Sequence, residues 1–346
     1  MFYVKNIYNS NQINKDGEIL MKIPEKINLA NLPTPILPLS YMKNELKDTE
    51  IYIKRDDFSG LETSGNKIRK LEFSLKEAID RGSTTIITCG GIQSNHCRTT
   101  ASVCASLGLK CHLVLRGTGN SIDGNLFLDK LFCAEITFIN EHDYTYKRNE
   151  LMESIKNKYE SNDEKAYIIP EGASNGIGMF GYYNAFLEIL EQEKNLGLEF
   201  NTICIAEGSG GTYAGLYAAN EILNKNKKIV GFNIYNKNAD VRSEIKNIIV
   251  EGMQIASSDH EMNYDNILIN SDYAFEGYGI CSKENIDFIK KFAAKTGIAL
   301  DPVYMGKAMY GLFSEIKKEN PLFLKNILII HTGGLFGLFP QKELFF

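Results

Sequence analysis

The sequence lacks an apolar run of the roughly 18 residues that a membrane-spanning helix requires, and residues 1–18 are polar, without the apolar core of a signal peptide. It also lacks a dense run of lysine and arginine. The 38 basic side chains stand against 43 acidic ones and leave a net charge of −5, so the electrostatic footprint of a nucleic-acid-binding protein is missing. These absences predict a cytoplasmic protein with no membrane or nucleic-acid partner.

Proline is sparse, with 8 residues among 346, while 44% of the residues are hydrophobic, which indicates a globular chain of about two domains. The seven cysteines are odd in number and scattered from Cys89 to Cys281, which is not a disulfide framework. No C-x₂-C pair exists, so we expect no metal site. Cys97 and Cys104, seven residues apart, are expected to be small apolar core residues on one helix face.

Short β-branched runs alternate with helical stretches, which is the pattern of βαβ units. The strands are expected to be parallel and buried, because their apolar runs are continuous. Strands are expected at residues 51–54, 84–89, 110–115, 134–139, 202–206, 229–235 and 326–331, and helices at 68–80, 95–107 and 213–223.

The charged stretch 146–165 contains neither glycine nor proline. It is expected to be a solvated helix and to mark a division between two domains. Residues 1–20 are either an ordered arm or a frayed end.

A lysine stands where a helix is expected to begin, in Ser64-Gly65-Asn66-Lys67. The positive end of a helix dipole disfavours an ammonium and makes the neutral amine more accessible, which suits Schiff-base formation. The other interpretation of Lys67 is a solvated surface lysine.

Two further segments lie between an expected strand and an expected helix. In the first, Gln93-Ser94-Asn95-His96 follows two glycines. Free backbone N–H groups there, with the Ser94 hydroxyl, could hold a carboxylate or phosphate, but a glycine turn with a Ser or Asn cap fits equally well.

The second segment is Glu207-Gly208-Ser209-Gly210-Gly211-Thr212, which favours a phosphate over a purely tight turn. It departs from the dinucleotide fingerprint, whose third glycine would fall at Tyr213, and no P-loop lysine follows. We therefore expect it to bind one phosphate.

The remaining loops could converge on this glycine loop, because ligands in open α/β sheets bind beyond the carboxyl ends of the strands. Tyr278 lies between two glycines, Tyr304 follows Asp301-Pro302-Val303, and Thr332 follows the last expected strand. Either tyrosine could donate a proton, although a packing role is the commoner one. A G-x-S-x-G nucleophile elbow is absent.

Together these motifs resemble the D-cysteine desulfhydrase and 1-aminocyclopropane-1-carboxylate deaminase family of pyridoxal-phosphate (PLP) enzymes, within the tryptophan-synthase-β-like superfamily of fold type II. The resemblance covers nearly everything after residue 30. Its motifs are Pro33-Thr34-Pro35, Lys54-Arg55-Asp56-Asp57, Gly65-Asn66-Lys67, Arg69-Lys70-Leu71-Glu72, Ile92-Gln93-Ser94-Asn95-His96, residues 207–212, Leu300-Asp301-Pro302-Val303-Tyr304, Gly306-Lys307 and His331-Thr332-Gly333-Gly334.

The resemblance implies a role for each matched position. Lys67 would carry the Schiff base, Asn66 would contact the phenolic oxygen of the cofactor, and Thr332 would lie near its pyridine nitrogen. The phosphate would bind at Gly208, Ser209, Gly210, Gly211 and Thr212. The substrate carboxylate would bind at Gln93, Ser94, Asn95 and His96, with Ser94, Tyr278 and Tyr304 facing the reacting atoms.

The family also implies a two-domain α/β fold with parallel-rich twisted sheets flanked by helices. A small domain would span residues 68–172, and a large PLP-binding domain would combine 1–67 and 173–346, usually in a homodimer. The implied reaction is β-elimination from a small amino acid, with D-cysteine giving pyruvate, sulfide and ammonia. The alternatives are a related PLP lyase acting on another substrate, such as cysteate or 1-aminocyclopropane-1-carboxylate, and a non-catalytic ligand-binding protein.

Three positions depart from the family pattern. Met305 stands where desulfhydrases carry threonine and cyclopropane deaminases glutamate, Leu335-Phe336 is bulkier than the usual small residues, and Ser64 replaces a common glycine. A carboxylate near the ring nitrogen would keep that nitrogen protonated and deepen the electron sink. Methionine cannot do so, which disfavours cyclopropane ring opening, and all three departures could reshape the substrate pocket.

Overall fold

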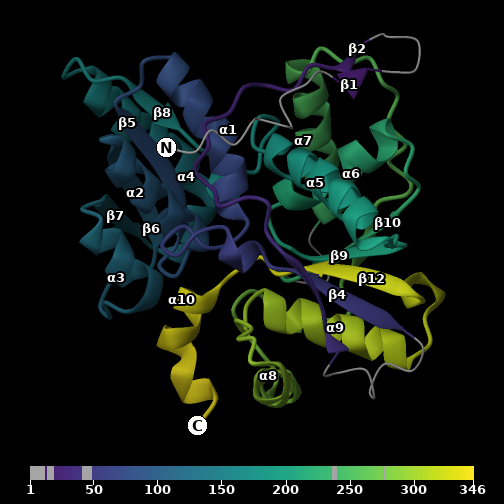
Figure 1. Cartoon of the computed structure of the whole chain (residues 1–346). Helices are drawn as coiled ribbons and strands as arrows, with labels where there is room; N and C mark the ends of the chain where they lie inside the picture. The colour runs from purple at the N-terminus through teal and green to yellow at the C-terminus, as the bar shows by residue number, and fades with distance from the viewer. Residues whose placement is uncertain (1–11, 14–18, 41–48, 236–239, 276) are drawn as a thin grey trace.

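Two separate β-sheets organise the computed structural model of the chain, which describes residues 12–13, 19–40, 49–235, 240–275 and 277–346 (Figure 1). The smaller sheet has four strands in the order β7-β6-β5-β8, all parallel. They are β5 (Thr85–Gly91), β6 (Lys110–Arg116), β7 (Glu135–Ile139) and β8 (Ala166–Ile168). Every residue of β5 except the last is buried, which explains its continuous apolar run.

Helices cover both faces of the smaller sheet. One face packs against α1 (Lys67–Asp80), α2 (Asn95–Leu107) and α3 (Gly124–Leu131). The other face packs against α4 (Glu141–Glu160), of which only Tyr144, Met152 and Ile155 are buried. The expected solvated helix is thus confirmed. The expected domain division there is wrong, because α4 connects β7 to β8 within one sheet, and its charge reflects an outer, solvent-facing position.

The larger sheet has six strands in the order β11-β10-β9-β12-β4-β3, parallel except for β3. They are β3 (Ile36–Pro38), β4 (Glu50–Lys54), β9 (Thr202–Glu207), β10 (Lys228–Asn233), β11 (Leu268–Asn270) and β12 (Asn326–Ile330). In the middle, Ile327 of β12 lies opposite Ile51 of β4 on one side and Thr202 of β9 on the other. The sheet therefore joins strands from both ends of the sequence.

Two layers of helices enclose this sheet (Figure 1). One face packs against α5 (Phe180–Leu196), α6 (Gly211–Ile222) and α7 (Val241–Ile255), and the other against α8 (Lys283–Thr296) and α9 (Met305–Lys317). The chain ends in α10 (Leu335–Leu338) and a 3₁₀ segment, η5 (Phe339–Leu344), after which Phe345 packs against the core between the larger sheet, α8 and α9.

All the strands and helices expected from the sequence are present, and the α/β fold with parallel-rich sheets is confirmed. Of the amino-terminal segment, β1 (Gln12–Ile13) and β2 (Ile19–Met21) pair antiparallel, and the expected arm or frayed end otherwise lies outside the described residues. Cys97 and Cys104 are fully buried in the core, as expected, and all seven cysteines are free. Across the described ranges, no helix is long and apolar enough to cross a bilayer.

Candidate active site

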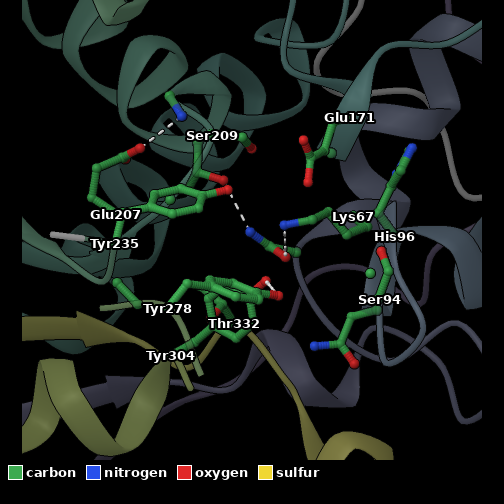
Figure 2. A pocket seen from close by; sticks show the side chains of 18 residues that line it. Lys67, Ser94, His96, Glu171, Glu207, Ser209, Tyr235, Tyr278, Tyr304 and Thr332 are labelled. Carbon is green, nitrogen blue, oxygen red and sulfur yellow. Dashed lines mark hydrogen bonds between the residues drawn. The ribbon is translucent and has the colours of Figure 1, made fainter. Parts of the chain in front are cut away.

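A cavity of about 660 Å³ lies where the carboxyl ends of strands from both sheets face each other, and Figure 2 shows its lining. Of the residues singled out in the sequence, it is lined by Asn66, Lys67, Ser94, Asn95, His96, Gly208, Ser209, Gly210, Thr212, Tyr278, Tyr304 and Thr332. Segments far apart in the sequence therefore meet at one site.

Lys67 begins helix α1 and directs its amine into the middle of the cavity (Figure 2). The amine donates a hydrogen bond to Asn66 Oδ1 at 3.1 Å, and the amide of Asn66 donates in turn to Thr212 Oγ1 at 3.0 Å. The positive φ of Gly65 (111°) permits its close approach to the Thr332 carbonyl, which accepts the Asn66 N–H at 3.2 Å. These contacts fix the lysine relative to both the glycine loop and β12.

Loss of water around its amine lowers the pKa of Lys67 to about 8, although the carboxylates of Glu207 and Glu171 act in the opposite direction. A substantial fraction of this amine is therefore neutral near pH 8, as a Schiff-base lysine requires. The interpretation of Lys67 as a solvated surface lysine does not fit this position.

The glycine loop connects β9 to α6 and lies beside the lysine. Gly210 adopts a φ of +85°, and a Cβ there would lie 2.8 Å from Ile248 Cδ1, so the loop needs glycine at this point. The Glu207 carboxylate stabilises the loop by accepting a hydrogen bond from the Gly210 N–H at 2.7 Å (Figure 2). Its burial raises the pKa of the Glu207 carboxyl to about 7. Gly211 begins α6 without lining the cavity, and its N–H donates to Ser174 Oγ at 3.3 Å.

A second lysine, Lys70, lies one turn along α1. In the sequence it belongs to a family motif but was assigned no role. It is fully buried, and its amine donates to Ser174 Oγ at 3.0 Å. Ser174 Oγ lies 2.7 Å from Ser209 Oγ of the glycine loop. No carboxylate in the described part of the chain forms a salt bridge with Lys70, and burial holds the pKa of its amine well below the usual range. A buried cation with no carboxylate partner beside such a loop fits a phosphate group.

The amino terminus of α2 forms the opposite wall. Ser94 is the N-cap, and its hydroxyl accepts the Cys97 N–H at 3.2 Å. Gln93 lies outside the lining, because its side chain donates to Asp123 O and accepts from Asn125 N. The expected cap and the expected anion site are therefore compatible, since capping leaves the first N–H groups of the helix available.

His96 is buried in this wall and carries no charge. Burial, with Lys67 and Lys70 nearby, holds its pKa well below the usual range. The Thr88 hydroxyl donates to Ile169 O at 2.7 Å, so His96 Nε2, at 2.8 Å from Thr88 Oγ1, is the donor in that bond. His96 Nδ1 is consequently an acceptor, and it has no partner among the described residues. It can accept a hydrogen bond from a bound ligand.

Tyr278 and Tyr304 form the third wall, with their hydroxyl oxygens 2.8 Å apart. Burial raises the pKa of Tyr278 to about 12 and holds that of Tyr304 well above its usual range, so both phenols keep their protons. Thr332 follows β12, and its N–H donates to Met305 Sδ at 3.4 Å. Leu335 and Phe336 do not line this cavity, nor does Ser64, which donates to Asp57 O at 2.9 Å.

Three further lining residues with ionisable side chains were not assigned a role from the sequence: Glu171, Glu207 and Tyr235. Glu207 is the last residue of β9, whereas Glu171 and Tyr235 lie two or three residues beyond the ends of β8 and β10. The general rule that ligands bind beyond the carboxyl ends of parallel strands would have marked all three positions.

A lysine of lowered pKa at a helix start, a phosphate-sized glycine loop and two protonated tyrosines, set between two parallel sheets, define the class of PLP-dependent enzymes of fold type II. The comparisons agree. A family model described as "Pyridoxal-phosphate dependent enzyme" matches residues 27–333, and the chain belongs to this family.

Individual proteins of known name are similar to this chain over most of its length. A Thermotoga maritima protein whose name proposes 1-aminocyclopropane-1-carboxylate deaminase is 43% identical over 92% of this chain and 99% of its own. An Arabidopsis thaliana protein named bifunctional D-cysteine desulfhydrase/1-aminocyclopropane-1-carboxylate deaminase, mitochondrial, is 39% identical over 91% and 80%. The crystal structure of an "ACC deaminase homologue" is 35% identical, with a TM-score of 0.85 over 93% of this chain and 95% of that one.

Proposed function

We propose that this protein catalyses β-elimination from a small amino acid, with D-cysteine as the preferred substrate. D-cysteine and water would give pyruvate, hydrogen sulfide and ammonia. The observation that carries the proposal is the position of the Lys67 amine, which lies in one cavity with the α2 terminus and the Tyr278–Tyr304 pair. A base, a carboxylate site and a proton donor are thus available within one cavity.

The residues present fit pyridoxal phosphate. Lys67 would hold the cofactor covalently, Asn66 and Thr332 would contact its ring, and Lys70 with residues 208–212 would hold its phosphate. When bound, the cofactor supplies an electron sink for the carbanion formed at the α-carbon.

The side chains of this chain would then act on the substrate. Ser94, Asn95 and His96 would hold the substrate carboxylate at the positive end of α2, which orients the α-hydrogen. The Lys67 amine would remove the α-proton. The Tyr278–Tyr304 pair would donate a proton to the departing sulfur, because both phenols are neutral at physiological pH.

The test is sulfide and pyruvate release from D-cysteine by the purified enzyme loaded with the cofactor. Lys67→Ala is expected to lose both products and the absorbance band of the lysine-bound cofactor. No product from D-cysteine or any other β-substituted amino acid would contradict an elimination. A protein that rejects added pyridoxal phosphate would instead be a non-catalytic binder.

Opening of 1-aminocyclopropane-1-carboxylate is not expected, although relatives carry that name. Met305 is fully buried against Thr332, so its position offers a thioether where ring opening calls for a carboxylate. The expected result is no α-ketobutyrate from this compound under conditions that convert D-cysteine. Ring opening at a similar rate would reverse the substrate assignment.

The proposal extends to the assembly. The small domain would span residues 68–172 and the large domain residues 1–67 and 173–346, in a cytoplasmic homodimer. The carboxyl-terminal segment supports a dimer, because Leu335, Phe339, Leu344 and Phe346 are all at least 45% exposed. Sedimentation equilibrium is expected to give twice the chain mass. A monomer at micromolar concentration would contradict the proposed homodimer.

A further inference from the structure

A second cavity, of about 800 Å³, adjoins the active site and is lined in part by the same residues. Gly91, Asn95, Tyr278 and Tyr304 line both cavities. A substrate whose carboxylate is held near Asn95 can therefore extend its side chain past the tyrosines into the second cavity.

Arg116 lies in the wall of this second cavity. It is the last residue of β6 and lies opposite Gly91 of β5 in the parallel register. Its Nη2 lies 3.7 Å from the position that a Cβ on Gly91 would take, and its guanidinium carbon lies 5.5 Å from the centre of the Tyr278 ring. The guanidinium is thus in contact with two residues of the active site.

The charges of two carboxylates act on Arg116, Glu141 through a salt bridge and Glu171 without one. Nη1 donates to Glu141 Oε1 at 3.0 Å, but the Glu141 side chain is 73% exposed, and such surface pairs are weak. Within the described residues, Nε and Nη2 form no hydrogen bond. Among the described residues of the lining, the one carboxylate is that of Asp301, and its oxygens accept from the N–H groups of residues 303–305. The Arg116 guanidinium therefore has donors available to a ligand in this cavity, whereas the oxygens of Asp301 are already engaged.

We propose that Arg116 is a specificity-determining residue that selects amino acids whose β-substituent is an anion or departs as one. The substituents of this class are thiolate, sulfinate, sulfonate and carboxylate, and a planar guanidinium binds the oxyanions among them through two parallel hydrogen bonds. This inference rests on the proposed function, because it places the substrate carboxylate at the start of α2.

The test uses aspartate and asparagine, which have nearly the same shape and differ in the charge of the β-substituent. Binding of each enantiomer is measured by the change in absorbance of the bound cofactor. The wild-type enzyme is expected to bind the preferred enantiomer of aspartate about tenfold more tightly than that of asparagine, as a charge-assisted hydrogen bond implies. Arg116→Gln is expected to abolish this preference and to leave asparagine binding unchanged.

Arg148→Gln is the matched control. The guanidinium carbons of Arg116 and Arg148 lie 5.2 Å and 5.1 Å from the centre of the same Tyr144 ring, but Arg148 lines neither cavity. It is expected to keep the wild-type preference for aspartate.

Equal binding of aspartate and asparagine by the wild-type enzyme would overturn the inference, as would a preference that survives Arg116→Gln. Either result is compatible with sulfide release from D-cysteine. Failure of the proposed function would appear separately, as no product from D-cysteine or any other β-substituted amino acid.

Discussion

Lys67 and Lys70 are neighbours on one face of α1, but their surroundings assign them to different tasks. Lys67 directs its amine into the cavity, where the charges of Glu207, Glu171 and Asp301 act on it. Lys70 is fully buried, with Ser174 as its hydrogen-bond partner, and the charge of Glu207 acts on it without a salt bridge. Burying a cation without a salt bridge is costly, so its presence beside the glycine loop is best explained by a bound dianion.

Lys70→Gln is therefore expected to weaken the binding of pyridoxal phosphate by about tenfold or more, because one charge-assisted hydrogen bond to the phosphate is lost. The binding of pyridoxal, which has no phosphate, is expected to change little. Both affinities can be measured by absorbance titration of the cofactor-free enzyme. An equal loss for both ligands would show that Lys70 acts on the fold rather than on the phosphate.

The sequence identified most of the site because those residues lie in short local patterns. Lys67 begins a helix after a glycine, and Ser94 caps another helix directly after a strand. Lys70 and Arg116 were assigned no role from the sequence, because the environment of each side chain depends on packing between distant segments. Lys70 meets Ser174, and Arg116 meets Tyr278, across more than 100 residues of sequence. No local pattern reports such contacts.

Helix α2 combines two functions in one residue, because Ser94 caps the helix and lines the cavity. Ser94→Ala is expected to destabilise the protein by about 1 kcal/mol through the lost cap and to raise the KM for the amino-acid substrate. Ser282→Ala is the control. Ser282 caps α8 through Asn285 N at the same 3.2 Å but lies outside the cavity.

Chemical denaturation and steady-state kinetics of the two variants separate these effects. Similar stability losses with a raised KM only for Ser94→Ala are expected. If both variants keep the wild-type KM, Ser94 is only a cap.

A pair of glycines offers a comparable test of the glycine loop. Gly210 and Gly108 both have positive φ, at +85° and +70°, but a Cβ on Gly108 would meet no atom within 4 Å. Gly108→Ala is expected to cost about 1 kcal/mol through backbone strain and to leave cofactor affinity unchanged. Gly210→Ala adds a clash with Ile248 and is expected to lower cofactor affinity as well. Unchanged affinity in Gly210→Ala would remove the loop from the phosphate site.

Strands and helices were predictable from the sequence where a local residue pattern marks their extent. Glycine ends α2 at Gly108, and β-branched runs mark β5 and β12. The role of α4 was not predictable, because its charge is compatible with both a linker and an outer helix. Only the pairing of β5 with β8 shows that α4 belongs within a sheet.

A buried charge network holds α1 against the larger sheet and α5. Arg69 of α1 binds both Asp56 and Glu188, and Glu188 also binds Lys54 of β4 at 2.6 Å. Burial alone would raise the pKa of Glu188, but Arg69 and Lys54 outweigh it and lower the pKa to about 2. The network thereby fixes the helix that carries Lys67.

Glu188→Gln is expected to lower the free energy of unfolding by about 3 kcal/mol, because Lys54 is left buried without its carboxylate. The pKa of Glu188 is lowered in the folded state, so its contribution is complete above the ordinary pKa of 4.5 and disappears as the pH falls toward 2. The stability difference between wild type and variant should shrink over that range, as measured by urea denaturation.

The exposed pair formed by Glu191 and Lys194 supplies the control. Glu191→Gln is expected to leave the stability nearly unchanged. A difference for Glu188→Gln that stays constant between pH 5 and pH 2 would contradict the assigned linkage.

The central position of β12 has a consequence for biosynthesis. This strand lies between β9 and β4, yet it is the last strand to leave the ribosome. While translation continues, β4 and β9 have no common neighbour, and Thr332 is missing from the cofactor cavity. The four-stranded sheet, whose strands fall within residues 85–168, can form much earlier because its contacts are closer in sequence. A chain truncated before residue 326 would lack both β12 and Thr332, and it is therefore expected to bind no cofactor.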